Sequence, residues 1–366
     1  MRNGETPSYK RVSQIAMAKV NQQMIADELD IDRTTVSRCF SNHPKINPDT
    51  RARVLELAAQ LGYRYKGQRA TKDRVKKRHS DIGVLIGVRD DMVEIPATSQ
   101  YLLKGISERA AMEGLSLDVR YIDPAELDAQ IHENRLPKGM RSGKSRWNGA
   151  ILIFPFTVDT IVSLSKKIST VSIAEDYSEG GVDCIDVDHH SGIYQMVAHL
   201  AELGHEKIGF YTWKYSVEAP WLYRRFGAFV DSLYRLGLAF EDKWALNVRK
   251  NDRIELPELE KQVAKGIRNG VTAWVCAADH QAYDLMPRLE KRGISIPKDC
   301  SITGFDGIVP PASQKQLTTI NVPFQEMGVS SVIRLIDRMR NPAAQRRHNL
   351  VEGAKVIGKT TAKPKA

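Results

Sequence analysis

The stretch Met24-Ile-Ala-Asp-Glu-Leu-Asp-Ile-Asp-Arg-Thr-Thr-Val-Ser-Arg38 decides how the N-terminal part of this chain folds. Its apolar residues recur at helical spacing on both sides of Asp30, which predicts two short helices joined by a tight turn. Aspartate tolerates the positive φ that such a turn requires, and Ala26 is small where the helices must approach each other. Asp32 is expected to cap the second helix. The pattern predicts a helix-turn-helix, whose second helix lies in the DNA major groove; a helical hairpin with charged faces is the alternative.

A third helix follows, and the sequence marks both of its ends. Asn47 is expected to cap it, Pro48 fits its first position, and Gly62 can take the left-handed conformation that ends a helix. We therefore predict a helical DNA-binding domain over residues 19–63, preceded by a polar tail over residues 1–18.

The positive charge of the chain is concentrated at its N-terminus. The formal net charge is +10, and residues 1–80 hold 17 lysines and arginines against 8 acidic residues. A basic module attached to a nearly neutral body indicates a polyanionic partner, most simply nucleic acid, although a solvated basic tail has the same composition. Residues 64–80 are rich in arginine and lysine and poor in apolar residues, which predicts a basic hinge or linker.

Composition argues against several other classes of protein. No apolar stretch approaches the roughly 20 residues of a membrane span, and the N-terminus lacks the apolar core of a signal peptide. The four cysteines are scattered and the nine histidines form no metal-binding pattern, so we expect neither disulfides nor a metal site. Phosphate-loop, nucleophile-elbow and dinucleotide-binding motifs are missing. We therefore expect a cytoplasmic protein that is not an enzyme and needs no cofactor.

From residue 80 onward, short apolar segments alternate with amphipathic ones, which predicts parallel sheets flanked by helices. The segment 81–366 is too long for one comfortable core, so we expect two lobes, one formed by 81–190 and 318–345 and the other by 191–317 and 346–366. The predicted strands are 82–87, 116–121, 149–154, 170–173, 184–187, 207–211, 273–277 and 301–305. The predicted helices lie near 101–113, 125–133, 158–167, 193–203, 225–236, 257–269 and 282–292.

Short motifs in a fixed order resemble the LacI/GalR family of bacterial repressors over nearly the whole chain. The headpiece motifs are Thr35-Val-Ser-Arg38, Asn47-Pro-Asp-Thr-Arg51 and Leu61-Gly-Tyr63; those of the core are Asp186-Val-Asp-His-His-Ser-Gly192, Leu203-Gly-His-Glu-Lys-Ile208, Arg224-Arg-Phe-Gly227, Ala278-Asp-His-Gln-Ala282, Ser301-Ile-Thr-Gly-Phe-Asp306 and Leu317-Thr-Thr-Ile320. The resemblance implies an all-α helix-turn-helix headpiece joined to an α/β core of two doubly wound parallel-sheet lobes, of the periplasmic-binding-protein-like type I.

The resemblance also implies a function and a set of DNA contacts. A family member of this kind is expected to be a repressor that binds a roughly palindromic DNA operator as a homodimer, with a small ligand in the cleft between the lobes modulating its affinity. A solute-binding or sensor protein without a DNA-regulatory role is the alternative. The base-reading positions match Arg33, Thr34 and Arg38, and the backbone-contacting positions match Thr35, Ser37, Asn47, Thr50 and Tyr63. Arginine can donate two hydrogen bonds to guanine, whereas backbone contacts set orientation.

The hinge departs from the family pattern. Tyr65-Lys66 stands where the family usually has Pro-Asn, and Arg69 and Lys72 stand at the positions of its alanine and of the leucine that wedges into the minor groove. Since a lysine cannot act as an apolar wedge, we expect weaker operator bending or a shifted hinge register.

The expected effector contacts are Arg224 and Asp279, which match family ligand positions. Ligands of open α/β sheets bind at the carboxyl ends of strands, and a facing arginine and aspartate can grip vicinal hydroxyls. This predicts a sugar, a sugar phosphate or a purine-like ligand. The alternatives are a surface ion pair for Arg224 and a helix cap for Asp279.

Overall fold

The computed structural model describes residues 20–41, 43, 45–63, 81–88, 97–133, 147–154, 156–177, 180–215, 219–249, 251–252 and 254–365. The chain divides into two compact units. Unit 1 consists of Met1–Asp186 and Phe324–Asn349, and unit 2 of Val187–Pro323 and Leu350–Ala366. Among the described residues, no helix has the length and apolarity that a membrane crossing demands.

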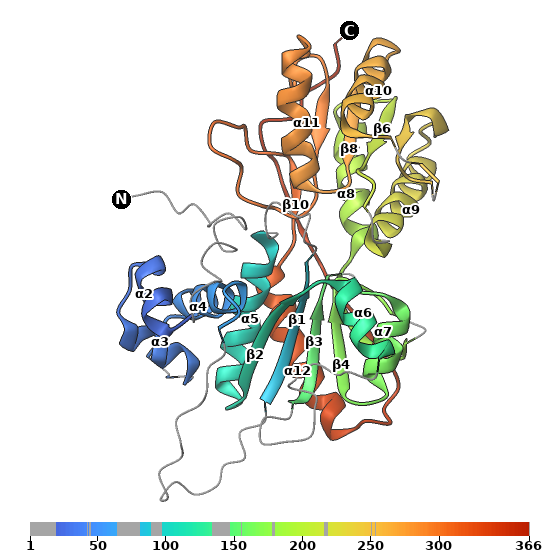
Figure 1. Cartoon of the computed structure of the whole chain (residues 1–366). Helices are drawn as coiled ribbons and strands as arrows, with labels where there is room; N and C mark the ends of the chain where they lie inside the picture. The colour runs from blue at the N-terminus through green and yellow to red at the C-terminus, as the bar shows by residue number, and fades with distance from the viewer. Residues whose placement is uncertain are drawn as a thin grey trace, which may run out of the picture. The chain divides into compact units, whose positions relative to one another are not determined.

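The headpiece in unit 1 is helical, as the sequence predicts. It contains α2 (Gln22–Leu29), α3 (Arg33–Phe40) and α4 (Pro48–Gln60). Asp30 has φ 53° at the turn between the first two helices, and Gly62 has φ 65° after the third. The headpiece therefore has the expected helix-turn-helix geometry (Figure 1).

A small apolar core holds these three helices together. Ile25, Ala26 and Val36 are fully buried at the α2–α3 contact, together with Val54 and Leu57 of α4. The caps differ in one respect from the prediction. The Asn47 side chain accepts a hydrogen bond from the N–H of Asp49 at 2.8 Å, as expected, whereas Asp32 occupies the N-cap position of α3 without a side-chain hydrogen bond.

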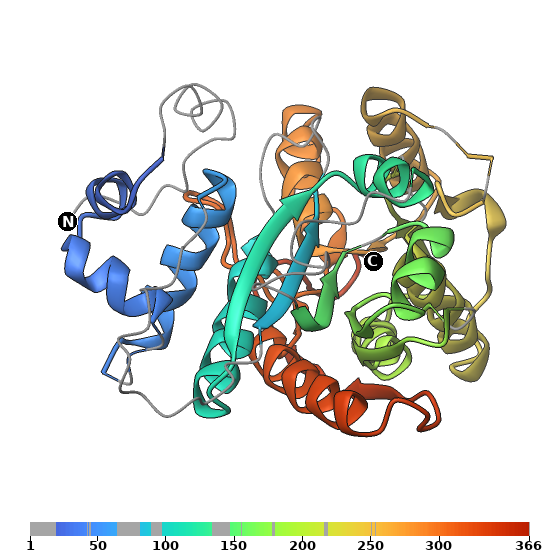
Figure 2. The same ribbon diagram turned by 60° about the horizontal axis from the view of Figure 1, so that its bottom comes forward.

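The α/β part of unit 1 is built on a six-stranded sheet with the order β11-β5-β4-β3-β1-β2. Neighbouring strands from β2 to β5 pair in parallel, with registers such as Val84↔Val119 and Val84↔Ile151. Helices α5 and α12 contact one another and the strands, and α4 lies beside α5 and β2 (Figures 1 and 2). The strands are β1 (Asp81–Gly87), β2 (Ser116–Ile122), β3 (Trp147–Ile153), β4 (Ser169–Ile173), β5 (Asp183–Val187) and β11 (His348–Val351); the helices are α5 (Ala97–Met112), α6 (Pro124–His132), α7 (Val158–Ser165) and α12 (Phe324–Arg340).

Helix α12, which our sequence analysis does not predict, is fixed to β5 by a buried charge network. The Asp183 carboxylate is fully buried and accepts hydrogen bonds from Arg338 Nε at 2.8 Å and from the N–H of Arg347 at 2.6 Å. Arg334 Nε lies 2.9 Å from the same carboxylate. Burial opposes ionisation of Asp183, but the arginine hydrogen bonds outweigh it and hold the pKa of this carboxyl below its usual range. The network attaches a late segment of the chain to a sheet formed mainly by early segments.

Unit 2 contains a four-stranded sheet with the order β7-β6-β8-β9, whose β6–β7, β6–β8 and β8–β9 pairs are parallel. A separate antiparallel pair is formed by β10 and β12. The strands are β6 (Ile208–Tyr211), β7 (Ala245–Leu246), β8 (Ala273–Cys276), β9 (Ser301–Thr303), β10 (Thr319–Asn321) and β12 (Ala354–Val356); the helices are α8 (His189–Glu202), α9 (Pro220–Arg235), α10 (Leu256–Arg268) and α11 (Asp279–Lys291), with the short 3-10 helix η3 (Asp242–Trp244).

The core of unit 2 is organised around Trp274, which the structure buries completely. Its ring packs among residues of α10, α11 and the sheet. A Cβ placed on Gly209 or Gly266 would lie 2.6 Å or 2.7 Å from this ring, so both glycines make room for it. On the other side of β6, the Phe210 ring packs at a tilt against Phe229 of α9, with 5.2 Å between the ring centroids. Helices therefore cover both faces of this sheet.

The predicted fold class is confirmed, and the differences lie at element ends and in late segments. All eight predicted strands and all seven predicted helices of the core have counterparts. Helix α9 begins at Pro220 and α11 at Asp279, earlier than the predicted 225 and 282. Besides α12, the sequence analysis misses β7, β10, β11 and β12, which are only two to four residues long and give too short a periodic signal.

The close contact between α5 and α12 gives a test of the packing in unit 1. A Cβ on Gly328 would lie 2.3 Å from the carbonyl oxygen of Leu102. We expect Gly328→Ala to force the helices apart and lower the free energy of unfolding by about 1–3 kcal/mol, measured by urea denaturation. Gly227→Ala is the matched control, because Gly227 lies exposed in α9 with nothing within 4 Å of the added Cβ. This control should be stabilised by up to about 1 kcal/mol, since alanine favours helix more than glycine does. Equal effects of the two substitutions would contradict the packing argument.

Candidate DNA-binding and ligand-binding sites

Helix α3 presents one apolar and one polar face. Val36 and Cys39 are buried against the headpiece core, whereas Arg33, Thr34 and Arg38, the candidate base-reading residues, are exposed on the opposite side. The helix therefore offers two guanidinium groups and a hydroxyl to whatever approaches this face. That arrangement suits a recognition helix, whose outward side chains reach the edges of base pairs.

The candidate backbone-contacting residues differ in exposure. Thr35, Ser37, Thr50 and Tyr63 are partly buried, and Asn47 is exposed. The Tyr63 ring packs against Phe40 with 5.4 Å between centroids, which fixes the end of α4 against α3. The hinge residues Arg69 and Lys72 lie outside the described residues.

Helix α4 is held against the α/β part of unit 1 by a buried carboxylate. Glu56 is 6% exposed, and it accepts hydrogen bonds from Gln100 Nε2 at 2.9 Å and from the hydroxyls of Ser99 and Tyr121 at 3.3 Å. Burial raises the pKa of the Glu56 carboxyl, although the three hydrogen bonds oppose the shift. This contact gives the headpiece a fixed position on α5 and β2.

In unit 2, the structure places Asp279 in the interior. The side chain is fully buried. Its Oδ2 accepts hydrogen bonds from the N–H groups of Gly307 at 2.7 Å and Ile308 at 2.9 Å, and its Oδ1 accepts one from the Thr319 hydroxyl at 2.6 Å. The helix-cap alternative is wrong, because Ala278 is the N-cap residue of α11. Asp279 instead ties the loop after β9 to β10, and its role as an effector ligand stays a prediction.

A second buried carboxylate, Asp306, lies in the same interior and is paired with Arg225. Arg225 Nη2 lies 3.1 Å from Asp306 Oδ1, and Arg225 Nε donates to His189 Nδ1 at 3.1 Å. The guanidinium also lies over the rings of Trp221 and Phe305 at 4.7 Å and 3.9 Å from their centroids. Arg225 of α9 therefore connects His189 of α8 with Asp306 in the loop after β9.

Arg224, the residue that the motif indicates, is partly exposed in the first turns of α9. The sequence analysis missed its neighbour Arg225, although a signal was available. Helical spacing places Arg225 on the same face as Leu222, Ala228 and Phe229, and these three residues are buried. An arginine on the apolar face of a helix indicates a buried ion pair.

Partly exposed aromatic residues surround the end of this sheet at which β6 and β8 finish. Tyr215 lies edge-on to Trp221, with 5.7 Å between the rings, and its hydroxyl is 2.9 Å from His280 Nε2. Trp213 packs edge-on to His280 at 5.2 Å, and Gln281 Nε2 donates to the Tyr215 hydroxyl at 2.7 Å. Aromatic faces beside hydrogen-bonding groups suit a ring-shaped polar ligand such as a sugar.

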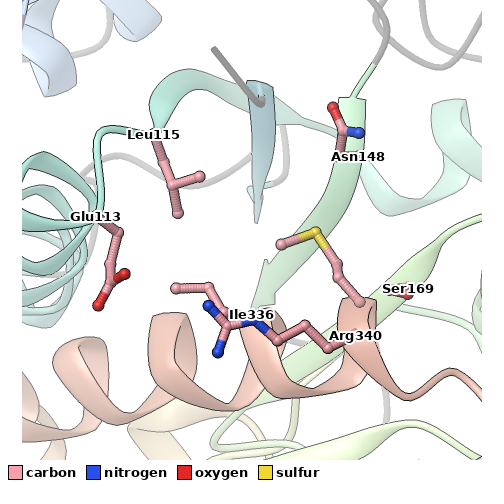
Figure 3. Close-up of a pocket in the computed structure, with 7 residues that line it drawn as sticks. Glu113, Leu115, Asn148, Ser169, Ile336 and Arg340 are labelled. Atoms are coloured by element: carbon pink, nitrogen blue, oxygen red, sulfur yellow. The ribbon is translucent and has the colours of Figure 1, made fainter. Parts of the chain in front are cut away.

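Unit 1 has a surface pocket of about 350 Å³ (Figure 3). Leu115, Asn148 and Ser169 place it at the amino ends of β2, β3 and β4, beside the last turns of α12. Because ligands of open α/β sheets bind at the carboxyl ends of the strands, this pocket is not the favoured effector site.

Comparisons with known proteins agree with this architecture. A family model for the periplasmic binding protein-like domain matches residues 197–361. The chain is 25% identical over 348 residues to the transcriptional repressor CytR of Escherichia coli K12, covering 93% of this chain and 96% of the repressor. It is 23% identical to NtdR, the NTD biosynthesis operon regulator of Bacillus subtilis, covering 91% of this chain and 97% of that regulator.

Two solved structures share the fold over most of the chain. One is a complex of the transcriptional regulator CelR with cellobiose, with a TM-score of 0.63, 16% identity and coverage of 93% of this chain and 100% of that chain. The other is the lac repressor dimer bound to operator and the anti-inducer ONPF, with a TM-score of 0.58, 19% identity and coverage of 94% of this chain and 100% of that chain.

The two buried carboxylates of unit 2 predict a pH-dependent stability. Burial and the charge of Asp306 raise the pKa of the Asp279 carboxyl to about 7. An unfolded aspartate titrates near 3.9, so folding takes up a proton between these two values and stability falls as the pH rises from about 4 to about 7. We expect Asp279→Asn to reduce this dependence, whose slope approaches about 1.4 kcal/mol per pH unit for one proton. Urea unfolding followed by tryptophan fluorescence measures it, because Trp213, Trp221, Trp244 and Trp274 all lie in unit 2. Identical pH profiles would contradict the raised pKa.

Proposed function

We propose that the chain is a bacterial transcriptional regulator of the LacI/GalR type, that it binds operator DNA as a dimer, and that a small ligand held by its α/β core changes its affinity for that DNA. The observation that carries this proposal is the exposed Arg33–Thr34–Arg38 face of α3, positioned by a buried headpiece core. A solute-binding protein without a regulatory role has no use for this helix-turn-helix, and the relatives that match the chain over most of its length are regulators.

The proposed DNA contacts divide into two classes. Arg33, Thr34 and Arg38 read base edges in the major groove, while Thr35, Ser37, Asn47, Thr50 and Tyr63 contact the phosphate backbone. Two headpieces related by a two-fold axis would read two half-sites, so the operator would be roughly palindromic. The lac repressor dimer bound to operator, which shares this fold, supports that arrangement.

We further propose a polyhydroxylated effector, in line with the cellobiose bound to CelR. It would contact Trp213, Tyr215 and Trp221 at the end of the unit 2 sheet, and Arg224 in the first turns of α9. A ligand changes an equilibrium only by as much as it prefers one conformation, so its contacts must differ between the DNA-bound and released states.

The base-reading role of Arg38 has a direct test. Wild-type protein first selects an operator from random-sequence duplex DNA. Arg38→Ala should then lose about 1–3 kcal/mol of affinity for this operator and much less for scrambled DNA, because a bidentate base contact carries discrimination. Thr50→Ala should weaken both complexes similarly. Arg235→Ala, which removes one exposed positive charge from α9 in unit 2, controls for net charge. Equal losses on both duplexes for Arg38→Ala would reassign Arg38 to a phosphate contact.

The effector proposal is tested by a thermal-shift screen of the whole chain against sugars, sugar phosphates and nucleobases. A true ligand at 100 times its dissociation constant should stabilise the protein by about 2.7 kcal/mol. Arg224→Ala should abolish this stabilisation and leave the melting temperature of the free protein close to that of the wild type, whereas Arg235→Ala, on the same helix, should keep the response. Retention of the full shift in Arg224→Ala would remove Arg224 from the site.

A further inference from the structure

Three side chains capable of binding a metal ion converge between β5 and β11 of unit 1. Cys184 and Asp186 lie two residues apart on β5 and therefore point to the same face of the strand. His348 begins β11, which neighbours β5 in the sheet. One donor atom from each residue, the thiol sulfur, a carboxylate oxygen and a ring nitrogen, lies within 4.8 Å of the other two. Asp183 belongs to the opposite face, where it pairs with α12.

The separation of His348 and Asp186 fits a shared ion better than a direct hydrogen bond. His348 Nε2 lies 3.6 Å from Asp186 Oδ2, beyond the roughly 2.7–3.2 Å of a nitrogen–oxygen hydrogen bond. Zinc binds nitrogen, oxygen and sulfur at about 2.0–2.3 Å, so two ligands of one tetrahedral ion lie about 3.3–3.8 Å apart. The observed separation falls in this interval.

A further carboxylate faces the other nitrogen of the same ring. Asp176 Oδ2 lies 3.7 Å from His348 Nδ1, on the side away from Asp186, and Asp176 also forms an ion pair with Arg346. Histidines that bind metals almost always donate their second ring N–H to a carboxylate, a carbonyl or water, which fixes the tautomer and the orientation of the ring. At 3.7 Å the Asp176 carboxylate is too far from Nδ1 for a direct hydrogen bond, so Asp176 acts on His348 through its charge.

We propose that Cys184, Asp186 and His348 bind a divalent transition-metal ion of the zinc type. The set offers a thiolate, a carboxylate and an imidazole, a combination that suits borderline-soft ions and not magnesium or calcium, which prefer oxygen ligands alone. Cys184 and Asp186 are buried, which excludes competing water, while the His348 side chain is 27% exposed and gives the ion a path from solvent. A water molecule would complete the tetrahedron.

The position of the site suggests what the ion does. The chain leaves unit 1 directly after Asp186 and again after Asn349, the residue that follows His348. A metal bound to both strands would cross-link these two exits of the chain. The histidine pattern in the sequence predicts no metal site, because the ligands come from strands far apart in the chain and only pairing of the strands brings them together.

Cobalt binding to the full-length, metal-free protein tests the proposal. We expect one equivalent of Co²⁺ per chain, with a thiolate-to-cobalt charge-transfer band that Zn²⁺ displaces. His348→Gln and Cys184→Ser should weaken binding at least tenfold, and Cys184→Ser should lose the band. Asp176→Asn, which leaves all three ligands in place and removes a negative charge beside the ring, should weaken binding less than the loss of a ligand does.

Two controls separate this site from general metal binding. His190→Gln removes an exposed histidine that pairs with Asp231 at 2.8 Å, and Cys300→Ser replaces another buried thiol. Both should retain the band and the stoichiometry. Because His348 lies at the surface, His348→Gln should fold even if Cys184→Ser does not, and circular dichroism establishes this. Absence of the band in the wild type, or equal affinity in wild type and His348→Gln, would overturn the proposal.

Discussion

The arrangement of unit 1 depends on the ion pairs that the buried Asp183 carboxylate forms with α12. This carboxylate is fully buried on β5 and is neutralised by Arg334 and Arg338 of α12. Loss of one partner from a buried charge pair typically costs about 3–5 kcal/mol, because the remaining charge has no solvent. Through this network α12 is fixed to the sheet, α5 packs on α12, and α4 of the headpiece packs on α5. The position of the DNA-binding helices thus rests on an ion pair formed by a late segment of the chain.

Unit 2 uses buried charge differently. Asp279 and Asp306 repel each other in a site from which water is excluded, and one arginine, Arg225, neutralises only one charge. Burial therefore raises the pKa of both carboxyls. Asp279 holds the loop after β9 and strand β10 through hydrogen bonds. The protonation state of the Asp279–Asp306 pair is therefore linked to how firmly these two segments are held. A ligand that binds at this end of the sheet would act on the same elements.

The two proposed small-ligand sites lie in different units and use different chemistry. The aromatic residues around Tyr215 and His280 offer ring faces and hydroxyl groups, which suit a sugar. The Cys184–Asp186–His348 cluster offers a thiolate, a carboxylate and an imidazole, which suit a metal ion. Since unit 1 ends after Asp186 and again after Asn349, the metal would bind beside the points where the chain leaves unit 1, whereas the sugar would bind at the end of the unit 2 sheet.

The sequence by itself determined the helix-turn-helix, the alternation of strands and helices, and which residues of α3 face outward, because each depends on local periodicity and turn chemistry. It did not predict α12, although the pattern of this helix is amphipathic. The strand that α12 is paired with, β5, lies far earlier in the chain. Only the tertiary structure decided that Asp279 is internal and that Cys184 meets His348. Those facts depend on contacts between distant segments, and no local spacing in the sequence encodes such distances.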